Sequence, residues 1–448
     1  MNLKEIHNVY FVGIGGIGMS ALARYFCKTG KQVAGYDKTP TKITADLEKL
    51  GIQIHFDDSI ESIPEIYTNK TNTLVVFTPA IPKNHSGLNS FISGGFQVLK
   101  RAEVLGLITK NTFCFAVAGT HGKTTTSSIL GHIMQPYNAT SFLGGISENY
   151  HSNLILGGDE ISVVEADEFD RSFLQLSPNI ACITSMDADH LDIYGEHSAL
   201  EDSFQEFADK VSDTLIVAKG SKVQGLTYAI DEEADYQISN VVIQKGNYIF
   251  DVKTPDASIH EITFLLPGKH NIMNALAALA MADCFGIPLE NIKKSLQTFT
   301  GVERRFSYKI KSEELILIDD YAHHPTEINA VYESVSEMYP NQKNVVVFQP
   351  HLFSRTRDFM DDFAMALSKF DEVLLLEIYP ARENPIEGVN SSKLLEKITH
   401  KNKKITHKQN LVKDIKNLEA KIVLMLGAGD IGMMVEEVKN QLIPVEKA

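Results

Sequence analysis

The stretch Ala118-Gly-Thr-His-Gly-Lys-Thr-Thr-Thr126 joins an apolar run at residues 113–117 to a helix-compatible run at residues 127–134. This is the pattern of a strand, a glycine turn and the start of a helix. Glycines let backbone N–H groups approach phosphate oxygens, and the helix dipole favours the same anion. Lys123 can reach terminal phosphates, and Thr124 can bind Mg²⁺. The stretch predicts a nucleoside triphosphate site, in a shorter form than the common GxxxxGK loop; a plain surface turn is the alternative.

Length, charge and cysteine content limit the class of protein. A chain of 448 residues predicts two to four domains of about 100 to 200 residues each. A net charge of -15 disfavours nucleic acid or an anionic membrane as the main partner. The four cysteines, Cys27, Cys114, Cys182 and Cys284, form no CxxC pair, which suits core positions in a reducing compartment. We find no membrane-length apolar run or convincing export signal, so we expect a cytoplasmic protein.

A second glycine turn, Gly13-Ile-Gly-Gly-Ile-Gly18, follows an apolar run at residues 9–12 and precedes a helical pattern at residues 19–26. Another strand at residues 32–36 ends at Asp37, and a third is expected at residues 73–77. The pattern predicts a small doubly wound α/β domain. The turn alone fits any tight strand-helix junction. A nucleotide-diphosphate substrate explains it better than a nicotinamide cofactor, which would leave the loop at Lys123 unexplained.

Later segments predict two more units, with borders near Lys110 and Thr300. We expect strands at residues 161–164 and 180–184, a short antiparallel excursion at residues 224–266, and a helix at residues 271–285. The last unit should hold strands at residues 315–318, 345–348, 373–376 and 422–426, the last running into the turn Gly427-Ala-Gly-Asp-Ile431. Ligands of open parallel sheets bind at the carboxyl ends of such strands.

Polar residues at these strand ends are candidates for chemistry. Glu165 and His190 each follow a strand of the central unit, so both could join Thr124 on Mg²⁺; a solvated acidic loop is the alternative. Paired arginines of the last unit lie in Gly301-Val-Glu-Arg-Arg-Phe306 and Phe348-Gln-Pro-His-Leu-Phe-Ser-Arg-Thr-Arg357, where they could grip carboxylate or phosphate or form a surface ion-pair face. Asp319-Asp-Tyr-Ala-His-His-Pro325 holds two histidines after a buried strand.

Taken together, these motifs resemble those of the Mur ligases over essentially the whole chain. The shared blocks are Gly13-Ile-Gly-Gly-Ile-Gly-Met-Ser20, Gly119-Thr-His-Gly-Lys-Thr-Thr125, Glu165-Ala-Asp-Glu168, Asp189-His190, Gly268-Lys-His-Asn-Ile-Met-Asn-Ala275, Gly301-Val-Glu-Arg-Arg-Phe306 and Asp319-Asp-Tyr-Ala-His-His-Pro325. The resemblance implies an α/β fold of three domains. These are an N-terminal Rossmann-like domain that holds a UDP-sugar (1–110), a central P-loop ATPase domain with a mixed sheet (111–299) and a C-terminal Rossmann-like domain that brings the amino acid (300–448).

The resemblance also implies a reaction, and it is closest to the members that add L-alanine. ATP phosphorylates the carboxylate of UDP-N-acetylmuramate to an acyl phosphate, and the amine of L-alanine then attacks it and phosphate leaves. This is a step of cytoplasmic peptidoglycan precursor synthesis, with ATP and Mg²⁺ as cofactors. A carboxylate needs such activation, and the charged intermediate needs Lys, Arg and Mg²⁺ nearby.

Residue roles follow from the same resemblance. The implied ATP-binding residues are Gly119, Thr120, His121, Gly122, Lys123, Thr124, Thr125, His270, Asn271, Asn274 and Arg304, and the implied metal ligands are Thr124, Glu165 and His190. The UDP diphosphate would lie on Gly15, Gly16, Ile17, Gly18, Met19 and Ser20, with Asp37 near the uridine. Arg305 and Arg355 would face the muramoyl carboxylate and phosphoryl oxygens, and Tyr321 and His323 the alanine. The implied catalytic set is Lys123, Arg304, Arg305, His323 and Arg355.

Three positions depart from the family pattern. Leu352 stands where many relatives have arginine, so one substrate contact is missing or is supplied by Arg357. Phe169 replaces a frequent serine, which should alter packing only. Residues 199–204 offer no lysine where sister ligases carry a carbamylated one, and alanine-adding relatives lack it too.

Other functions remain open at this point. A murein-peptide recycling ligase would share the chemistry but use a peptide as nucleophile. An NAD-dependent oxidoreductase would explain only the first glycine turn, and a non-catalytic nucleotide-binding regulator would not need the full set of metal and phosphate ligands. We expect small-molecule substrates as partners, a monomer or weak homodimer, and a hinge near Thr300 that assembles the site.

Overall fold

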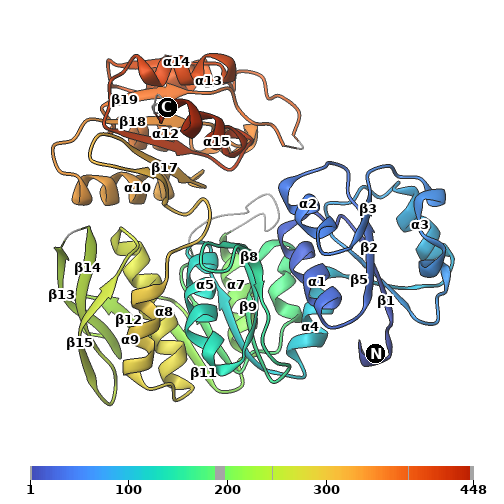
Figure 1. Cartoon of the computed structure of the whole chain (residues 1–448). Coiled ribbons are helices and arrows are strands. Elements are labelled where there is room, and N and C mark those ends of the chain that lie inside the picture. The colour runs from blue at the N-terminus through green and yellow to red at the C-terminus, as the bar shows by residue number, and fades with distance from the viewer. Residues whose placement is uncertain (1–2, 187–196, 245, 382, 444–448) are drawn as a thin grey trace, which may run out of the picture. The chain divides into compact units, whose positions relative to one another are not determined.

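The computed structural model describes residues 3–186, 197–244, 246–381 and 383–443, and it contains three β-sheets flanked by helices (Figure 1). Contacts divide the chain into two compact units. The first comprises Met1–Val241, Ile249–Thr263 and Met273–Phe299, and the second comprises Val242–Tyr248, Phe264–Ile272 and Thr300–Ala448. The expected α/β class with three sheet-bearing domains is confirmed. The first compact unit contains the first sheet and most of the second, and the second unit contains the third sheet.

The first sheet has five parallel strands in the order β3-β2-β1-β4-β5. The strands are β1 (Asn8–Val12), β2 (Gln32–Tyr36), β3 (Gln53–His55), β4 (Thr73–Phe77) and β5 (Gln97–Lys100). Its helices are α1 (Ile17–Lys28), α2 (Lys42–Glu48), α3 (Ser86–Ser93) and α4 (Arg101–Thr109). The order of the strands reverses beside β1, which places the first glycine turn at the switch point where such sheets bind ligands.

The second sheet has ten strands in the order β15-β14-β13-β12-β11-β10-β6-β9-β7-β8. The strands are β6 (Phe113–Ala118), β7 (Thr140–Ser147), β8 (Ser152–Ile155), β9 (Ile161–Glu165), β10 (Ile180–Ile183), β11 (Thr214–Ala218), β12 (Leu226–Ile230), β13 (Tyr236–Gln244), β14 (Asn247–Lys253) and β15 (Ser258–Phe264). Its helices are α5 (Lys123–Met134), α7 (His197–Ala208), α8 (Lys269–Cys284) and α9 (Leu289–Thr298).

This sheet is mixed, as predicted, because β7 and β8 pair antiparallel whereas β6 pairs parallel with both of its neighbours, β9 and β10. The prediction of antiparallel pairing across residues 224–266 is wrong for its first pair. Strands β12 and β13 run parallel, with Tyr228 opposite Tyr236. Alternation of apolar and polar residues identifies a half-buried strand but does not determine the direction of its neighbour.

The third sheet has six strands in the order β16-β17-β21-β18-β19-β20, and only β16 is antiparallel. The strands are β16 (Ser307–Lys311), β17 (Ile316–Asp320), β18 (Asn344–Phe348), β19 (Glu372–Leu375), β20 (Lys403–Ile405) and β21 (Ile422–Leu426). The helices are α10 (Pro325–Met338), α11 (Phe353–Asp358), α12 (Met360–Leu367), α13 (Ser391–Lys397), α14 (Leu411–Lys416) and α15 (Ile431–Leu442). Short 3-10 turns of the chain lie at Leu3–Glu5, Ile60–Ser62, Glu65–Thr68, Gln135–Tyr137, Phe169–Gln175 and Lys408–Asn410.

Apolar cores lie on both faces of the third sheet. Ile316 and Ile318 of β17 face one core, and Leu317 between them faces the other, as the two-residue period of a strand requires. Cys114 and Cys182 are fully buried in the second sheet, where burial raises the pKa of each thiol to about 12, so they are inert core residues. Within the described part of the chain, the longest helices are too short or too polar to cross a lipid bilayer.

Candidate active site

The phosphate loop lies between β6 and α5 in the conformation that its glycines allow. Gly119 has φ +129° and Gly122 has φ +83°, both in the region that side chains disfavour. A Cβ on Gly119 would lie 2.2 Å from Oγ1 of Thr184, and one on Gly122 would lie 2.5 Å from Oδ1 of Asn274. No side chain caps the start of α5 at Gly122, so its first N–H groups can serve an anion.

Two residues after β10 brace this loop. The backbone N–H of Thr120 donates to the carbonyl of Ser185 (3.1 Å), and that of His121 donates to the Ser185 hydroxyl (2.9 Å). The Thr184 hydroxyl donates to the carbonyl of His121. Sequence reasoning extended a strand to Thr184 but assigned no role to either residue. The loop is therefore held in shape from the neighbouring strand.

Lys123 forms a buried ion pair with Glu168. Its Nζ lies 2.9 Å from the Glu168 carboxylate and 2.5 Å from the carbonyl oxygen of Gly119. Burial alone would lower the pKa of Lys123, but the charges of Glu168, Asp167 and Glu165 outweigh it and raise the pKa above its usual value. Lys123 is thus a fixed cation beside the loop. Glu168 belongs to the motif at residues 165–168, but no local pattern in the sequence indicates that it pairs with Lys123.

The proposed metal ligands in the described residues carry oxygen donors that suit Mg²⁺. Thr124 is buried in the first turn of α5, and Glu165 ends β9 opposite Val117 of β6. The N–H of Gly144 donates to Oε2 of Glu165 (3.1 Å), and a Cβ on Gly144 would lie only 2.3 Å from both carboxylate oxygens. Strand β7 therefore orients the carboxylate. A hydroxyl and a carboxylate are hard ligands of the kind that Mg²⁺ takes.

His190, the third expected ligand, lies outside the described residues, as do Asp187 and Asp189 of its motif. Among the residues that are described, we find no cluster of three His, Cys, Asp or Glu side chains able to hold a metal. The metal site therefore remains a prediction that rests on Thr124 and Glu165 within the structure.

The start of α8 brings one of its three predicted nucleotide residues to the phosphate loop. Asn274 accepts a hydrogen bond from the Thr126 hydroxyl (3.2 Å) and packs on Gly122. Asn271 is buried and donates to the carbonyl of Pro267 (2.6 Å) within its own turn, while His270 is exposed. Asn274 thus contacts the loop directly, and Asn271 stabilises its own helix start.

The first glycine turn lies at the carboxyl end of β1, and Asp37 holds it. The N–H of Gly15 donates to Oδ2 of Asp37 (2.7 Å). No side chain caps the start of α1 at Gly16, so the first N–H groups of α1 can serve an anion. Met19 is buried in the core, and the Ser20 hydroxyl accepts a hydrogen bond from Asn153 Nδ2 (2.8 Å). Gly15, Gly16, Ile17 and Gly18 therefore form the accessible part of the predicted set.

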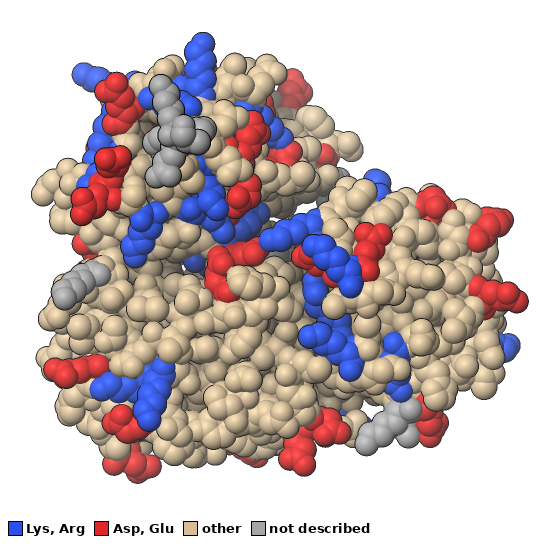
Figure 2. Space-filling model, in the orientation of Figure 1, with Lys and Arg blue, Asp and Glu red and all other residues tan. Residues whose placement is uncertain are grey.

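Arg101 adds a positive charge to this turn that sequence reasoning missed. A Cβ on Gly18 would lie 2.7 Å from its Nη1, so the guanidinium packs against the turn. Nη2 of Arg101 lies 3.5 Å from Oδ2 of Asp167, which neighbours Glu168 in the central domain. An anion bound at the turn would meet this charge. Over the face seen in Figure 2, basic and acidic side chains are interspersed, so such local cations must attract an anionic substrate.

In the second unit, two guanidiniums approach the ring of Tyr321. Cζ of Arg304 is 5.0 Å and Cζ of Arg305 is 5.3 Å from the centre of its ring. Arg304 also lies 3.5 Å from Oδ1 of Asp319 and donates to the carbonyl of Gly427. Nη1 of Arg305 lies 3.8 Å from Oε1 of Glu327. The structure therefore brings these three predicted residues together at the carboxyl end of β17.

His323 is held as a neutral imidazole. Its Nδ1 lies 2.9 Å from the carbonyl oxygen of Tyr321 and 3.2 Å from Oε2 of Glu327, so Nδ1 carries the proton and Nε2 the lone pair. Burial lowers the pKa of His323 to about 4; the Glu327 carboxylate opposes this shift and the Arg355 guanidinium adds to it. The adjacent His324 instead accepts from the Thr326 N–H (3.3 Å) and caps α10.

Glu327 was missed, although the spacing His324-x-x-Glu327 at a helix start signals a capping box. Arg355 is half-buried in α11, close enough for its charge to act on His323. Arg357 is exposed, and its Nε donates to Oδ1 of Asp358 (2.7 Å). Arg357 thus pairs with Asp358 at the surface, whereas the charge of Arg355 acts on His323.

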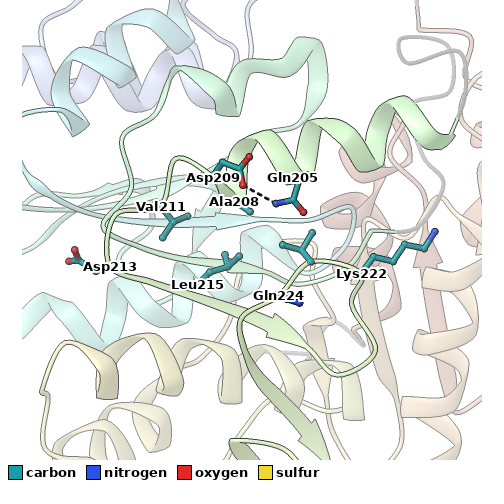
Figure 3. A pocket seen from close by; sticks show the side chains of 9 residues that line it. Gln205, Ala208, Asp209, Val211, Asp213, Leu215, Lys222 and Gln224 are labelled. Carbon is teal, nitrogen blue, oxygen red and sulfur yellow. Dashed lines mark hydrogen bonds between the residues drawn. The ribbon is translucent and has the colours of Figure 1, made fainter.

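A hollow of about 420 Å³ lies elsewhere, beside α7. Figure 3 shows Gln205 bonded to Asp209 on one side (2.9 Å), with Asp213, Leu215 and Gln224 lining the other. Asp213 immediately precedes β11 and Gln224 precedes β12, so the hollow lies at the amino ends of these strands. The phosphate loop follows the carboxyl end of β6, and the hollow therefore belongs to a different edge of the sheet.

Family models match three successive parts of the chain. They are described as "Mur ligase family, catalytic domain" for residues 8–112, "Mur ligase middle domain" for residues 117–282 and "Mur ligase, glutamate ligase domain" for residues 304–432. The UDP-N-acetylmuramate–L-alanine ligase of Flavobacterium psychrophilum is 60% identical over 446 residues, 99% of each chain.

Two solved structures have a similar fold. The UDP-N-acetylmuramate–alanine ligase of Thermotoga maritima has a TM-score of 0.83 and 29% identity, covering 97% of this chain and 98% of its own. A murein peptide ligase of Psychrobacter arcticus has a TM-score of 0.70 and 19% identity, covering 98% and 99%.

Proposed function

Because the chain belongs to the Mur ligase family, we propose that it is an ATP-dependent ligase that joins L-alanine to the carboxylate of UDP-N-acetylmuramate. The observation that carries this function is the 60% sequence identity between this chain and a relative named UDP-N-acetylmuramate–L-alanine ligase, over 99% of both chains. The reaction is a step of peptidoglycan precursor synthesis, and thereby serves cell shape, the cell cycle and division. We place it in the cytoplasm, with no nucleic acid or membrane partner, and expect a monomer or weak homodimer.

Activation of the carboxylate falls to the first unit. The muramoyl carboxylate attacks the γ-phosphorus of ATP, ADP leaves, and an acyl phosphate forms. Lys123 and the uncapped N–H groups at the start of α5 hold the β- and γ-phosphates, and Lys123 offsets the charge that moves onto the leaving oxygen. Mg²⁺, bound by Thr124, Glu165 and His190, would neutralise further phosphate charge. Gly15 to Gly18, with Asp37 bracing the turn, would hold the UDP diphosphate.

Amide formation involves the second unit. The neutral amine of L-alanine attacks the acyl carbon, the tetrahedral intermediate collapses, and inorganic phosphate and a proton are released. Arg305 and Arg355 would hold the phosphoryl and carboxylate oxygens, with Arg304 beside them. His323 offers the Nε2 lone pair to orient the amine, and Tyr321 lines the same place. Its pKa of about 4 makes His323 an orienting hydrogen-bond acceptor rather than a strong base.

The rival functions explain less of the chain. A dehydrogenase would leave Lys123, Thr124 and Glu165 without use, and a non-catalytic regulator would not require a carboxylate oriented by Gly144. The peptide-recycling ligase remains the second candidate because its fold is shared at a TM-score of 0.70. We also propose domain borders at residues 110 and 300. With these borders each of the three sheets falls within a single domain, which supports them.

Phosphate release from ATP tests the function. With UDP-N-acetylmuramate, release should require L-alanine, and Lys123→Ala should abolish it. Release with a murein tripeptide but not with L-alanine would establish the recycling enzyme instead. Small-angle scattering with an ATP analogue and the sugar nucleotide tests the proposed hinge near Thr300, and unchanged curves would refute closure.

A further inference from the structure

Two loops at the carboxyl edge of the third sheet are bonded to each other. One, residues 349–358, follows β18 and contains α11, and the other, residues 376–390, follows β19. The N–H of Tyr379 donates to the carbonyl of Pro350 (2.8 Å), and the N–H of Leu352 donates back to Tyr379 (2.9 Å). The rings of His351 and Tyr379 stack, with centres 5.7 Å apart and an angle of 17° between the planes.

We call the bonded pair of loops, residues 349–358 and 376–390, the clip. Glu383 adds a further contact between these loops at the start of α11. Its Oε2 accepts from the backbone N–H of Ser354 (3.0 Å), and its Oε1 accepts from the Ser354 hydroxyl. Burial raises the pKa of Glu383, but the hydrogen bonds from Ser354 and Phe353 outweigh it and lower the pKa below its usual value. The carboxylate therefore stays ionised and replaces a helix cap that no nearer residue provides.

The backbone that Glu383 holds is strained. Leu352, immediately before α11, has φ +71° and ψ 138°, a region that residues with a Cβ rarely adopt. Such a conformation persists only when its surroundings impose it. Arg355 follows three residues later on the same short helix, so its direction depends on this turn.

We infer that Glu383 is a positioning residue that sets the start of α11 so that Arg355 faces the reacting carboxylate and phosphoryl oxygens. The inference rests on the proposed function, because it assigns Arg355 to that reaction. Neither Glu383 nor Ser354 touches substrate in this scheme. Their effect on the rate passes through the backbone of residues 352–355.

A double-mutant cycle tests the inference. Glu383→Gln keeps the size of the side chain but loses the charge and one acceptor, so kcat/KM for L-alanine should fall about tenfold in the wild-type background. In an Arg355→Lys background the single ammonium cannot make the paired contacts of a guanidinium, so correct placement of the helix gains less and the further loss should be under about twofold. Glu387→Gln, an exposed carboxylate of the same loop, is the matched control and should change neither value.

Equal losses in both backgrounds would overturn the inference, and so would wild-type kinetics of Glu383→Gln. A purely structural role would lower the melting temperature without this dependence on Arg355. If Glu383→Gln does not fold, Ser354→Ala, which removes one bond of the clip, takes its place with the same criterion. Failure of the wild-type protein to form product would refute the proposed function itself, whereas an additive cycle in an active enzyme would refute only the role of Glu383.

Discussion

Gly144→Ala is expected to damage the metal site from a strand that carries no recognised motif. The new Cβ would lie 2.3 Å from both oxygens of Glu165, whereas real Cβ contacts almost never fall below 3.0 Å. Relief of this clash requires a relative shift of ~0.7 Å, which the end of the flexible Glu165 side chain can make most easily. The move also breaks the 3.1 Å bond from the Gly144 N–H. Loss of such an orienting partner typically costs about 10- to 100-fold in metal affinity.

Phosphate release measured across a Mg²⁺ titration is the assay for Gly144→Ala. The Mg²⁺ concentration for half-maximal rate should rise at least about tenfold, while the maximal rate at saturating Mg²⁺ recovers in large part. Gly286→Ala is the control, because Gly286 has φ +92° and nothing within 4 Å of a Cβ. It adds backbone strain of about 1 to 2 kcal/mol without touching the site. An unchanged Mg²⁺ dependence in Gly144→Ala would refute Glu165 as a metal ligand.

The remaining predictions concern other charged groups. Glu168→Ala should lower the free energy of unfolding in urea by about 3 to 5 kcal/mol, because Lys123 would stay buried without its carboxylate; a loss under ~1 kcal/mol would contradict the buried pair. The folded-state pKa of His323, about 4, lies below its ordinary 6.5, so its contribution to stability is complete above pH 6.5 and lost as the pH falls toward 4. The difference in unfolding free energy between wild type and His323→Gln should therefore shrink over that range, and a difference that grows would contradict a neutral, buried imidazole. Arg357→Ala should leave kcat/KM for L-alanine within about twofold, since its exposed partner is Asp358; a large loss would mean that Arg357 reaches substrate.

Strands with continuous apolar runs could be located from the sequence almost to the residue. Residues 32–36, 73–77 and 422–426 match β2, β4 and β21 because turn residues bound each run. β16 was missed because it is a polar edge strand. β7 was missed because Gly144 and Gly145 interrupt its pattern, yet one of these glycines makes room for the Glu165 carboxylate. The glycine that the Glu165 carboxylate requires therefore weakens the strand pattern by which β7 could have been recognised.

Site residues could be predicted where spacing along the chain encodes the chemistry. The phosphate loop and the paired histidines were found in this way, and the structure then divides the pair into an orienting His323 and a capping His324. The partners Glu168, Arg101 and Glu383 could not be found, because each meets its target across more than 25 positions and no local pattern marks the pairing.

One apolar core continues from the first sheet into the second. Phe26 of α1 and Leu154 of β8 belong to the same cluster, the ring of Tyr25 meets that of Phe142 edge to face at 5.3 Å, and Asn153 reaches the carbonyl of Ile17 (2.6 Å). A fragment cut at residue 110 would expose this apolar surface and leave the helix behind the first glycine turn without its support. Residues 1–110 are therefore a domain by chain topology but should aggregate when expressed alone, and proteolysis should release residues 1–299 as one piece.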